Sequence, residues 1–273
     1  MRRRISPALA IGLGLAACLV GVAVLSLLWT PEPPTRVRIP LRLRPPGVAG
    51  WLGTDHFGRD VLSMLMAGAW NSLAISVPAV GAGALVGTAI GCAAAALRGP
   101  TEAAVLRVSD VVFAFPAVLS AIMIGSVLGS GPLTGTIAIA IFNIPVFVRV
   151  SRASALQVWA MDYVAAARAV GRRPSAITFT DVLPNISGIL VVQVTIQLAL
   201  AILTEAGLSY LGLGVRPPNP SWGRMLADSQ TYLGQAPYLA IAPGVAVAVS
   251  VLGLNLLGDG LRDLLDPRLR RQP

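Results

Sequence analysis

The chain of 273 residues is 55% hydrophobic and only 12% charged. That is about half the charge of a soluble domain, so the expected surroundings are a lipid bilayer. All 21 basic residues are arginine and the net charge is +9. The absence of lysine excludes an ordinary Walker ATP site and Schiff-base chemistry, and a single histidine excludes His-rich metal sites.

Stretches without charge identify the membrane spans, because charged side chains are costly in hydrocarbon. A span needs about 20 apolar residues, and Gly and Pro at 129–132 divide the longest uncharged stretch. Residues 61–70 are predicted to form an interfacial helix after the N-cap Asp60. The sequence predicts six membrane-spanning helices, near 8–29, 72–97, 109–129, 133–150, 186–206 and 238–258.

The arginines predict the orientation. Fourteen of them lie at the termini and in the inner connections, and seven lie in the outer loops. Six spans put both termini on one side, and the positive-inside rule makes that side the cytoplasm. The apolar run after the basic N-terminus continues past Cys18 to Leu28, which favours a retained span over a cleaved signal peptide. Cys18 and Cys92 fall in different spans and are predicted to be packing residues.

Small and polar residues inside the spans suggest packing and a pathway. Gly83, Gly87 and Gly91 form one smooth stripe where another helix can approach closely, either from this chain or from another subunit. The candidate pathway residues at membrane depth are Asn143, Gln193 and Gln197.

Catalytic constellations are absent from the sequence. His56 lies in a turn-rich outer segment, where a structural role is favoured. Asp110, Glu205 and Asp259 lie at the ends of predicted spans, whereas an ion-coupled carrier usually needs charged groups near the midplane. The chain is therefore predicted to be a passive, non-enzymatic pathway whose energy is supplied elsewhere.

The inner loop at about 150–185 has the composition of ordered helix. Residues 162–170 contain good helix formers, with Asp162 to cap or favour the positive end and Gly171 as a left-handed stop. A second amphipathic piece, residues 175–183, precedes Pro184. The first helix is equally compatible with docking into a groove of another protein and with a structural surface role.

This loop resembles the EAA signature of the permease subunits of ATP-binding-cassette (ABC) importers. Residues 165–167, Gly171 and Leu183-Pro184 keep its spacing. Ala165 stands where the signature has Glu, and Asp181 stands where it has a hydrophobic residue.

Other segments extend the resemblance to the dipeptide/oligopeptide/nickel permease family, and to the C-type partner of its two membrane subunits. They occur in the family's order from about residue 50 to 269. The segments are 51–62, 109–116, 162–171, 183–185, 205–215, 217–226 and 255–269.

The resemblance implies an all-α polytopic membrane protein with the type I ABC importer permease fold. Residues 1–70 would hold the first span, an outer loop and the interfacial helix, residues 71–260 the permease core, and residues 261–273 a cytoplasmic tail. Residues of the 150–185 loop would couple to the ATPases. The residues implied for this coupling are Asp162, Tyr163, Ala165, Ala166, Ala167, Arg168, Gly171, Leu183 and Pro184.

The resemblance also implies partners in the cell membrane of a prokaryote. These are a second homologous permease, two ATPase subunits or domains, and an external substrate-binding protein. ATP and Mg²⁺ would be bound by the ATPases, with no cofactor, metal or nucleic acid on this chain. Peptide is the expected substrate. The alternatives are a nickel ion or metal chelate in the same family, a secondary transporter without ATPases, and a membrane enzyme.

Overall fold

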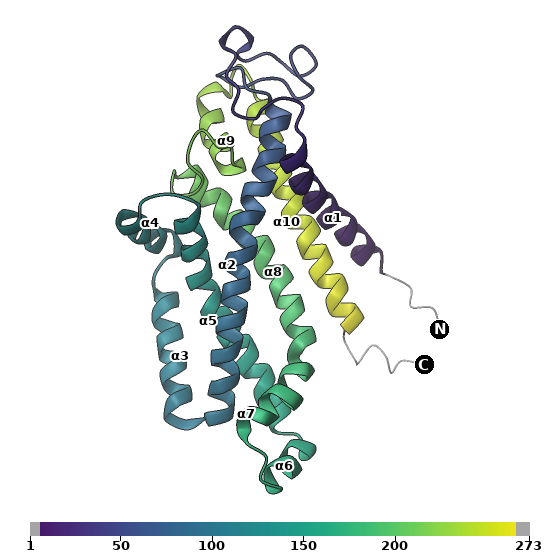
Figure 1. Ribbon diagram of the computed structural model, residues 1–273, viewed down its shortest axis with the longest axis vertical. Helices are drawn as coiled ribbons and strands as arrows, with labels where there is room; N and C mark the ends of the chain where they lie inside the picture. The colour runs from purple at the N-terminus through teal and green to yellow at the C-terminus, as the bar shows by residue number, and fades with distance from the viewer. Residues whose placement is uncertain (1–5, 266–273) are drawn as a thin grey trace.

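The computed structural model describes residues 6–265, in which every regular element is a helix (Figure 1). Five helices are long and apolar enough to cross a membrane, and the number is six if a bent pair of helices counts as one broken span. The long helices are α1 (Pro7–Leu28), α2 (Val61–Leu97), α5 (Pro132–Trp159), α8 (Leu183–Tyr210) and α10 (Tyr238–Leu265). The bent pair is α3 (Gly99–Ala114) and α4 (Ala117–Leu128). The shorter helices are α6 (Asp162–Ala169), α7 (Pro174–Ile177) and α9 (Trp222–Ser229).

The bundle has two ends, here called the α6 end and the α9 end after the short helices they carry (Figure 1). Helix α1 runs antiparallel to α10, and glycines let their backbones touch. A Cβ atom at Gly12 would overlap the backbone of Leu257, and one at Gly260 would overlap Leu9. The start of α1 and the end of α10 therefore point toward the same end, that of α6. The arginines at 2–4, 268, 270 and 271, and most of the predicted tail, lie outside the described residues.

The predicted interfacial helix at 61–70 was wrong, because these residues are the first turns of α2. The helix is continuous from Val61 to Leu97, and Asp60 caps it by accepting the Ser63 N–H at 2.8 Å. Val61, Met64 and Ala69 are buried in an apolar cluster with residues of α9 and α10. The apolar face of residues 61–69, which was expected to lie on the membrane surface, is therefore covered by protein. The predicted domain boundary at residue 70 falls inside α2.

The span predicted at 109–129 is not one straight helix, because α3 and the main part of α4 meet at 88°. The break lies at Phe115-Pro116. A proline disfavours helical geometry in the residue before it, and Phe115 is extended, with φ −88° and ψ 127°. Figure 1 shows α4 turned across the bundle while α3 runs along it.

Helix α5 continues beyond the predicted end at residue 150, through Arg149 and Arg152, to Trp159. Both arginines pair with acids of α3. Arg152 binds Glu102, and Arg149 binds Asp110 while its guanidinium lies 4.4 Å from the Phe113 ring centroid. The end of this helix was predicted from the position of the charged residues. The helix continues past them because the acids of α3 pair with both arginines.

Helix α8 begins before the predicted start at 186, as the continuation of α7. The two are joined by a π-turn at Thr178–Val182, in which the Leu183 N–H bonds to the Thr178 carbonyl. Pro184 explains the wider turn, because its ring would clash with the carbonyl four residues earlier in an ordinary α-helix. The predicted amphipathic piece at 175–183 is therefore part of one long helical segment.

The glycine stripe of α2 lies against α5 of the same chain. A Cβ atom at Gly87 would stand 2.5 Å from the Ile144 carbonyl oxygen and 2.7 Å from the Phe147 Cβ. Cβ atoms at Gly83 and Gly91 would overlap Asn143 and Ser151. The structure thus places the stripe in an intramolecular contact, one of the two alternatives that the sequence left open.

We expect Gly87→Ala to lower the free energy of unfolding by about 1–3 kcal/mol, because the methyl group would push α2 away from α5. Gly81→Ala is the matched control, since a Cβ atom at Gly81 in the same helix meets nothing within 4 Å. Thermal unfolding of the two purified variants in detergent tests the contact. Equal losses of stability in both variants would contradict it.

Candidate functional site

The segment after α5 forms α6, the helix of eight residues at one extreme of the molecule (Figure 1). Met161 is its N-cap, so Asp162 lies in the first turn, where a carboxylate favours the positive end of the helix dipole. Gly171 ends it with φ +80°. The Gly171 N–H bonds to the Arg168 carbonyl at 2.9 Å and the Arg172 N–H to the Ala167 carbonyl at 3.1 Å, which is a Schellman motif.

One buried side chain anchors α6 to the bundle. Val164 is 0% exposed and packs with Ile177 and Val182 and with residues of α2 and α5. Ala166 lies roughly 200° around the helix from Val164 and therefore faces away from the bundle. Ala165 and Ala166 are exposed and Ala167 is half-buried. The free face of α6 thus carries small alanine side chains, with the exposed carboxylate of Asp162 one turn before Ala166.

Two arginines of this segment have partners within the chain. The Arg168 guanidinium lies 5.8 Å from the Trp159 ring centroid. Arg172 pairs with Asp181 at 3.0 Å, so the acid that departs from the family pattern holds the α6–α7 turn closed.

The start of α8 is tied to α6 as well. The Tyr163 hydroxyl lies 3.2 Å from the Asn185 amide nitrogen, next to Leu183 and Pro184. Tyr163 itself remains 45% exposed.

A cavity of about 190 Å³ lies among α3, α4, α5 and α8. Of the predicted pathway residues, Asn143 and Gln197 line it, together with Thr204, Phe113 and Phe142. Gln193 is half-buried on α8 and is not part of this lining. The side chains around the cavity are all uncharged, and most are apolar.

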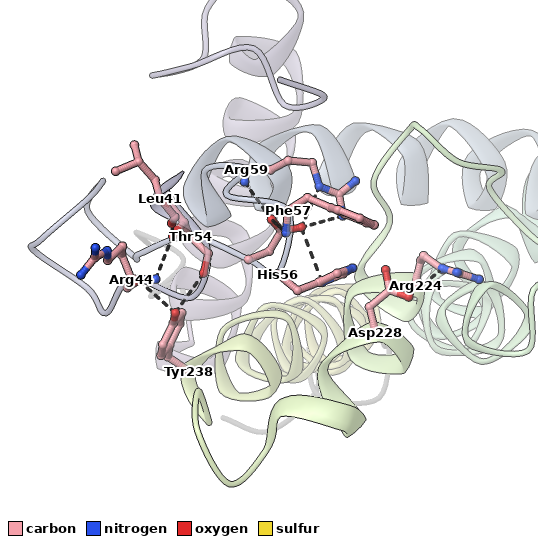
Figure 2. Close-up of polar contacts among 10 residues, drawn as sticks. Leu41, Arg44, Thr54, His56, Phe57, Arg59, Arg224, Asp228 and Tyr238 are labelled. Atoms are coloured by element: carbon pink, nitrogen blue, oxygen red, sulfur yellow. Dashed lines mark hydrogen bonds and ion pairs between the residues drawn. The ribbon is translucent and has the colours of Figure 1, made fainter. Parts of the chain in front are cut away.

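A polar cluster at the α9 end fixes the loop between α1 and α2. The Asp55 carboxylate accepts hydrogen bonds from the backbone N–H groups of Phe57 at 2.9 Å and Arg59 at 2.7 Å, and its other oxygen pairs with the Arg59 guanidinium at 2.6 Å. His56 stacks on Tyr232, with 5.2 Å between ring centroids. Figure 2 shows His56, Phe57 and Arg59 gathered above the side chains of Arg224 and Asp228, which pair with each other.

The arginine-rich segment 36–44 belongs to the same cluster. Its backbone pairs with the turn-rich segment that follows, since the Leu43 N–H bonds to the Asp55 carbonyl and the Thr54 N–H to the Arg44 carbonyl. The Tyr238 hydroxyl donates to the carbonyl oxygens of Arg44 and Thr54, each 2.9 Å away (Figure 2). These contacts give the segment a structural role that no sequence motif indicated.

Sequence reasoning missed the depth at which Glu205 is buried. The residue was assigned to a span end, yet it is 1% exposed between α2 and α8. Its two oxygens accept hydrogen bonds from Ser72 at 2.7 Å and Ser209 at 2.6 Å. Two serines in the sequence could have indicated this burial. Ser72 lies in an apolar stretch, and Ser209 follows the glutamate by one helical turn.

Comparison with known proteins agrees with this architecture. A family model described as a binding-protein-dependent transport system inner membrane component matches residues 87–271. A putative peptide transport system permease protein of Brucella suis is 42% identical over 99% of this chain and 90% of its own length. The dipeptide transport system permease protein DppC of Alkalihalophilus pseudofirmus is 36% identical over 95% of this chain and 86% of its own length. The glutathione transport system permease protein GsiD of Pectobacterium atrosepticum is 40% identical over 82% of this chain and 75% of its own length.

A solved structure shows the same fold. The inward-facing MetNI methionine ABC transporter matches with a TM-score of 0.63 at 19% identity, over 74% of this chain and 97% of the matched chain. The fold is that of a type I ABC importer permease. The chain belongs to the family of binding-protein-dependent transport system inner membrane components.

Proposed function

We propose that this chain is a permease subunit of an ATP-driven importer and forms half of a translocation pathway for peptides. The observation that carries the proposal is the form of α6, a short helix held by one buried valine with its alanine face turned away from the bundle. Such a face fits a groove on a second protein. Family membership supports an ATPase as that protein.

In this proposal α6 transmits movement between the ATPases and the pathway. The side chains of Val164, Ile177 and Val182 pack α6, α7 and the π-turn into one cluster with α2 and α5. A displacement of α6 would therefore move the inner ends of two long helices together. The α6 end faces the cytoplasm in this arrangement, as do both chain termini. Ala165 leaves the docking to shape, because the usual carboxylate is missing.

The cavity among α3, α4, α5 and α8 is the proposed pathway surface. Two carboxamides, Asn143 and Gln197, offer donors and acceptors to a backbone amide without imposing a charge. Such a surface suits substrates whose side chains vary. A second homologous permease would complete the pathway, and an external binding protein would deliver the substrate.

Peptide is favoured over the alternatives by the relatives, whose names specify peptide, dipeptide and glutathione transport. A nickel ion or metal chelate and an ion-driven carrier remain as competing outcomes of the test.

The test is purification followed by reconstitution. The tagged chain, isolated from its own membranes in mild detergent, should bring with it a second permease and ATPase subunits. Vesicles containing the complex and the external binding protein should take up a labelled dipeptide only with ATP at the ATPase side. Uptake that follows an imposed ion gradient without ATP would overturn the proposal, and ATP-driven uptake of nickel but not peptide would overturn its substrate.

A further inference from the structure

A buried carboxylate joins two long helices near the α9 end. Glu205 of α8 accepts a hydrogen bond from Ser72 of α2 on one oxygen and from Ser209 of its own helix on the other. Both serines are 0% exposed. A leucine or methionine would pack two helices together without the cost of removing a carboxylate from water. A purely structural contact therefore does not explain the choice of glutamate.

The Ser209 hydroxyl extends this network into the segment after α8. While it donates its hydrogen to Glu205, its oxygen accepts the Val215 N–H at 3.2 Å. The Leu213 N–H bonds to the Leu208 carbonyl at 2.8 Å. Gly214 lies so close to Ser209 that a Cβ atom there would overlap the hydroxyl. Residues 211–215 thus sit directly on the end of α8.

The same residues lie over one side of the cavity. Val215 is 5% exposed and packs in one apolar cluster with Ala121, Ala138 and Leu208, all three of which line the cavity. Leu213 packs against this cluster, and its carbonyl accepts the Gly131 N–H of the α4–α5 turn at 3.2 Å. Residues 211–215 therefore lie against the cluster that forms one wall of the cavity and beside the α4–α5 turn.

We infer that residues 211–215 are a cover over the cavity and that Glu205 is the positioning residue that keeps the cover seated. The inference rests on the proposed function, because it takes the cavity as the pathway. Glu205 acts through Ser209. As an acceptor, the carboxylate holds the hydroxyl hydrogen, so the oxygen lone pairs face the Val215 N–H. An apolar residue could not orient the hydroxyl in this way.

The experiment measures how readily the cavity is reached from the side of the binding protein. Thr204→Cys places a reporter thiol in the cavity lining, in a chain also carrying Cys18→Ser and Cys92→Ala, assembled with its partner subunits in membrane vesicles. A cationic, membrane-impermeant thiol reagent is added on the α9 side. We expect slow modification in this parent, and modification at least 10-fold faster after Glu205→Gln or Ser209→Ala.

Ser72→Ala is the matched control. It removes a hydrogen bond to the same carboxylate but leaves the Ser209–Val215 contact in place, so we expect less than a 2-fold change. A merely structural role for Glu205 predicts equal effects of Ser72→Ala and Glu205→Gln, and equal rates for these two variants would overturn the role assigned to Glu205. Ser209→Ala removes the Val215 contact directly, so it tests the cover itself even if Glu205→Gln fails to assemble. Equal rates for Ser209→Ala and Ser72→Ala would overturn the cover.

A separate readout tests the pathway itself. ATP-driven uptake by the Thr204→Cys parent is measured before and after complete modification. A loss of uptake supports the cavity as the pathway. Unchanged uptake would show that the cavity is not part of the pathway, and the function proposed for that surface would fail. The modification rates test a separate point, which is how residues 211–215 are seated.

Discussion

Ala166→Glu is expected to lower ATP-driven uptake at least 10-fold while the chain still reaches the membrane. Ala166 is exposed on the face of α6 opposite the buried Val164, so the new side chain would project from the surface proposed to dock on the ATPase. A longer, charged side chain adds both bulk and a desolvation cost to docking, and about 1.4 kcal/mol corresponds to a factor of ten. Uptake and ATP hydrolysis are measured on the same vesicles.

Ala166→Ser is the control for this prediction, because it changes polarity with little change of size. Gly171→Leu tests the same helix by another route: leucine is strained at φ +80°, whereas Gly171→Asn tolerates that geometry. We expect Leu to uncouple hydrolysis from uptake and Asn to retain most of the coupling. Wild-type uptake in both Ala166→Glu and Gly171→Leu would mean that α6 is not the coupling helix.

The second large effect is expected at the α9 end, where Asp55→Ala should lower the free energy of unfolding by about 3–5 kcal/mol. The substitution removes acceptors for two backbone N–H groups and leaves the Arg59 guanidinium, whose side chain is only 11% exposed, without its partner. The loop between α1 and α2 should then separate from α9 and α10. The melting temperature in detergent is expected to fall by roughly 5–10 °C.

A nearby ion pair supplies the control. Arg36 pairs with Glu32 at 3.3 Å, but its side chain is 61% exposed. Exposed pairs contribute about 0–1 kcal/mol, so Arg36→Ala should leave the melting temperature nearly unchanged. If Asp55→Ala and Arg36→Ala lower it equally, the buried pair does not hold the loop.

The sequence predicted the features that depend on local pattern. The uncharged stretches located all five long helices, and the position of Gly171 predicted where α6 ends. Both features depend on local physical chemistry. Charged side chains are costly in hydrocarbon, and glycine readily adopts the left-handed backbone conformation that ends a helix.

The errors came from contacts between distant segments and from prolines that were given too little weight. Phe115-Pro116 bends α3 away from α4, and Pro184 makes the π-turn. The burial of residues 61–69 depends on α9 and α10, which lie far along the chain. Glu205 finds its partner Ser72 at a separation of 133 residues, and no local pattern encodes that meeting.

The glycine contact between α1 and α10 has a consequence for biogenesis. Synthesis proceeds from the N-terminus, so α1 is made well before α10, the helix that packs against Gly12 and Leu9. Until then, the face of α1 that α10 will cover must meet lipid or the insertion machinery. The packing of α1 therefore waits for a helix that is made more than 200 residues later in the chain.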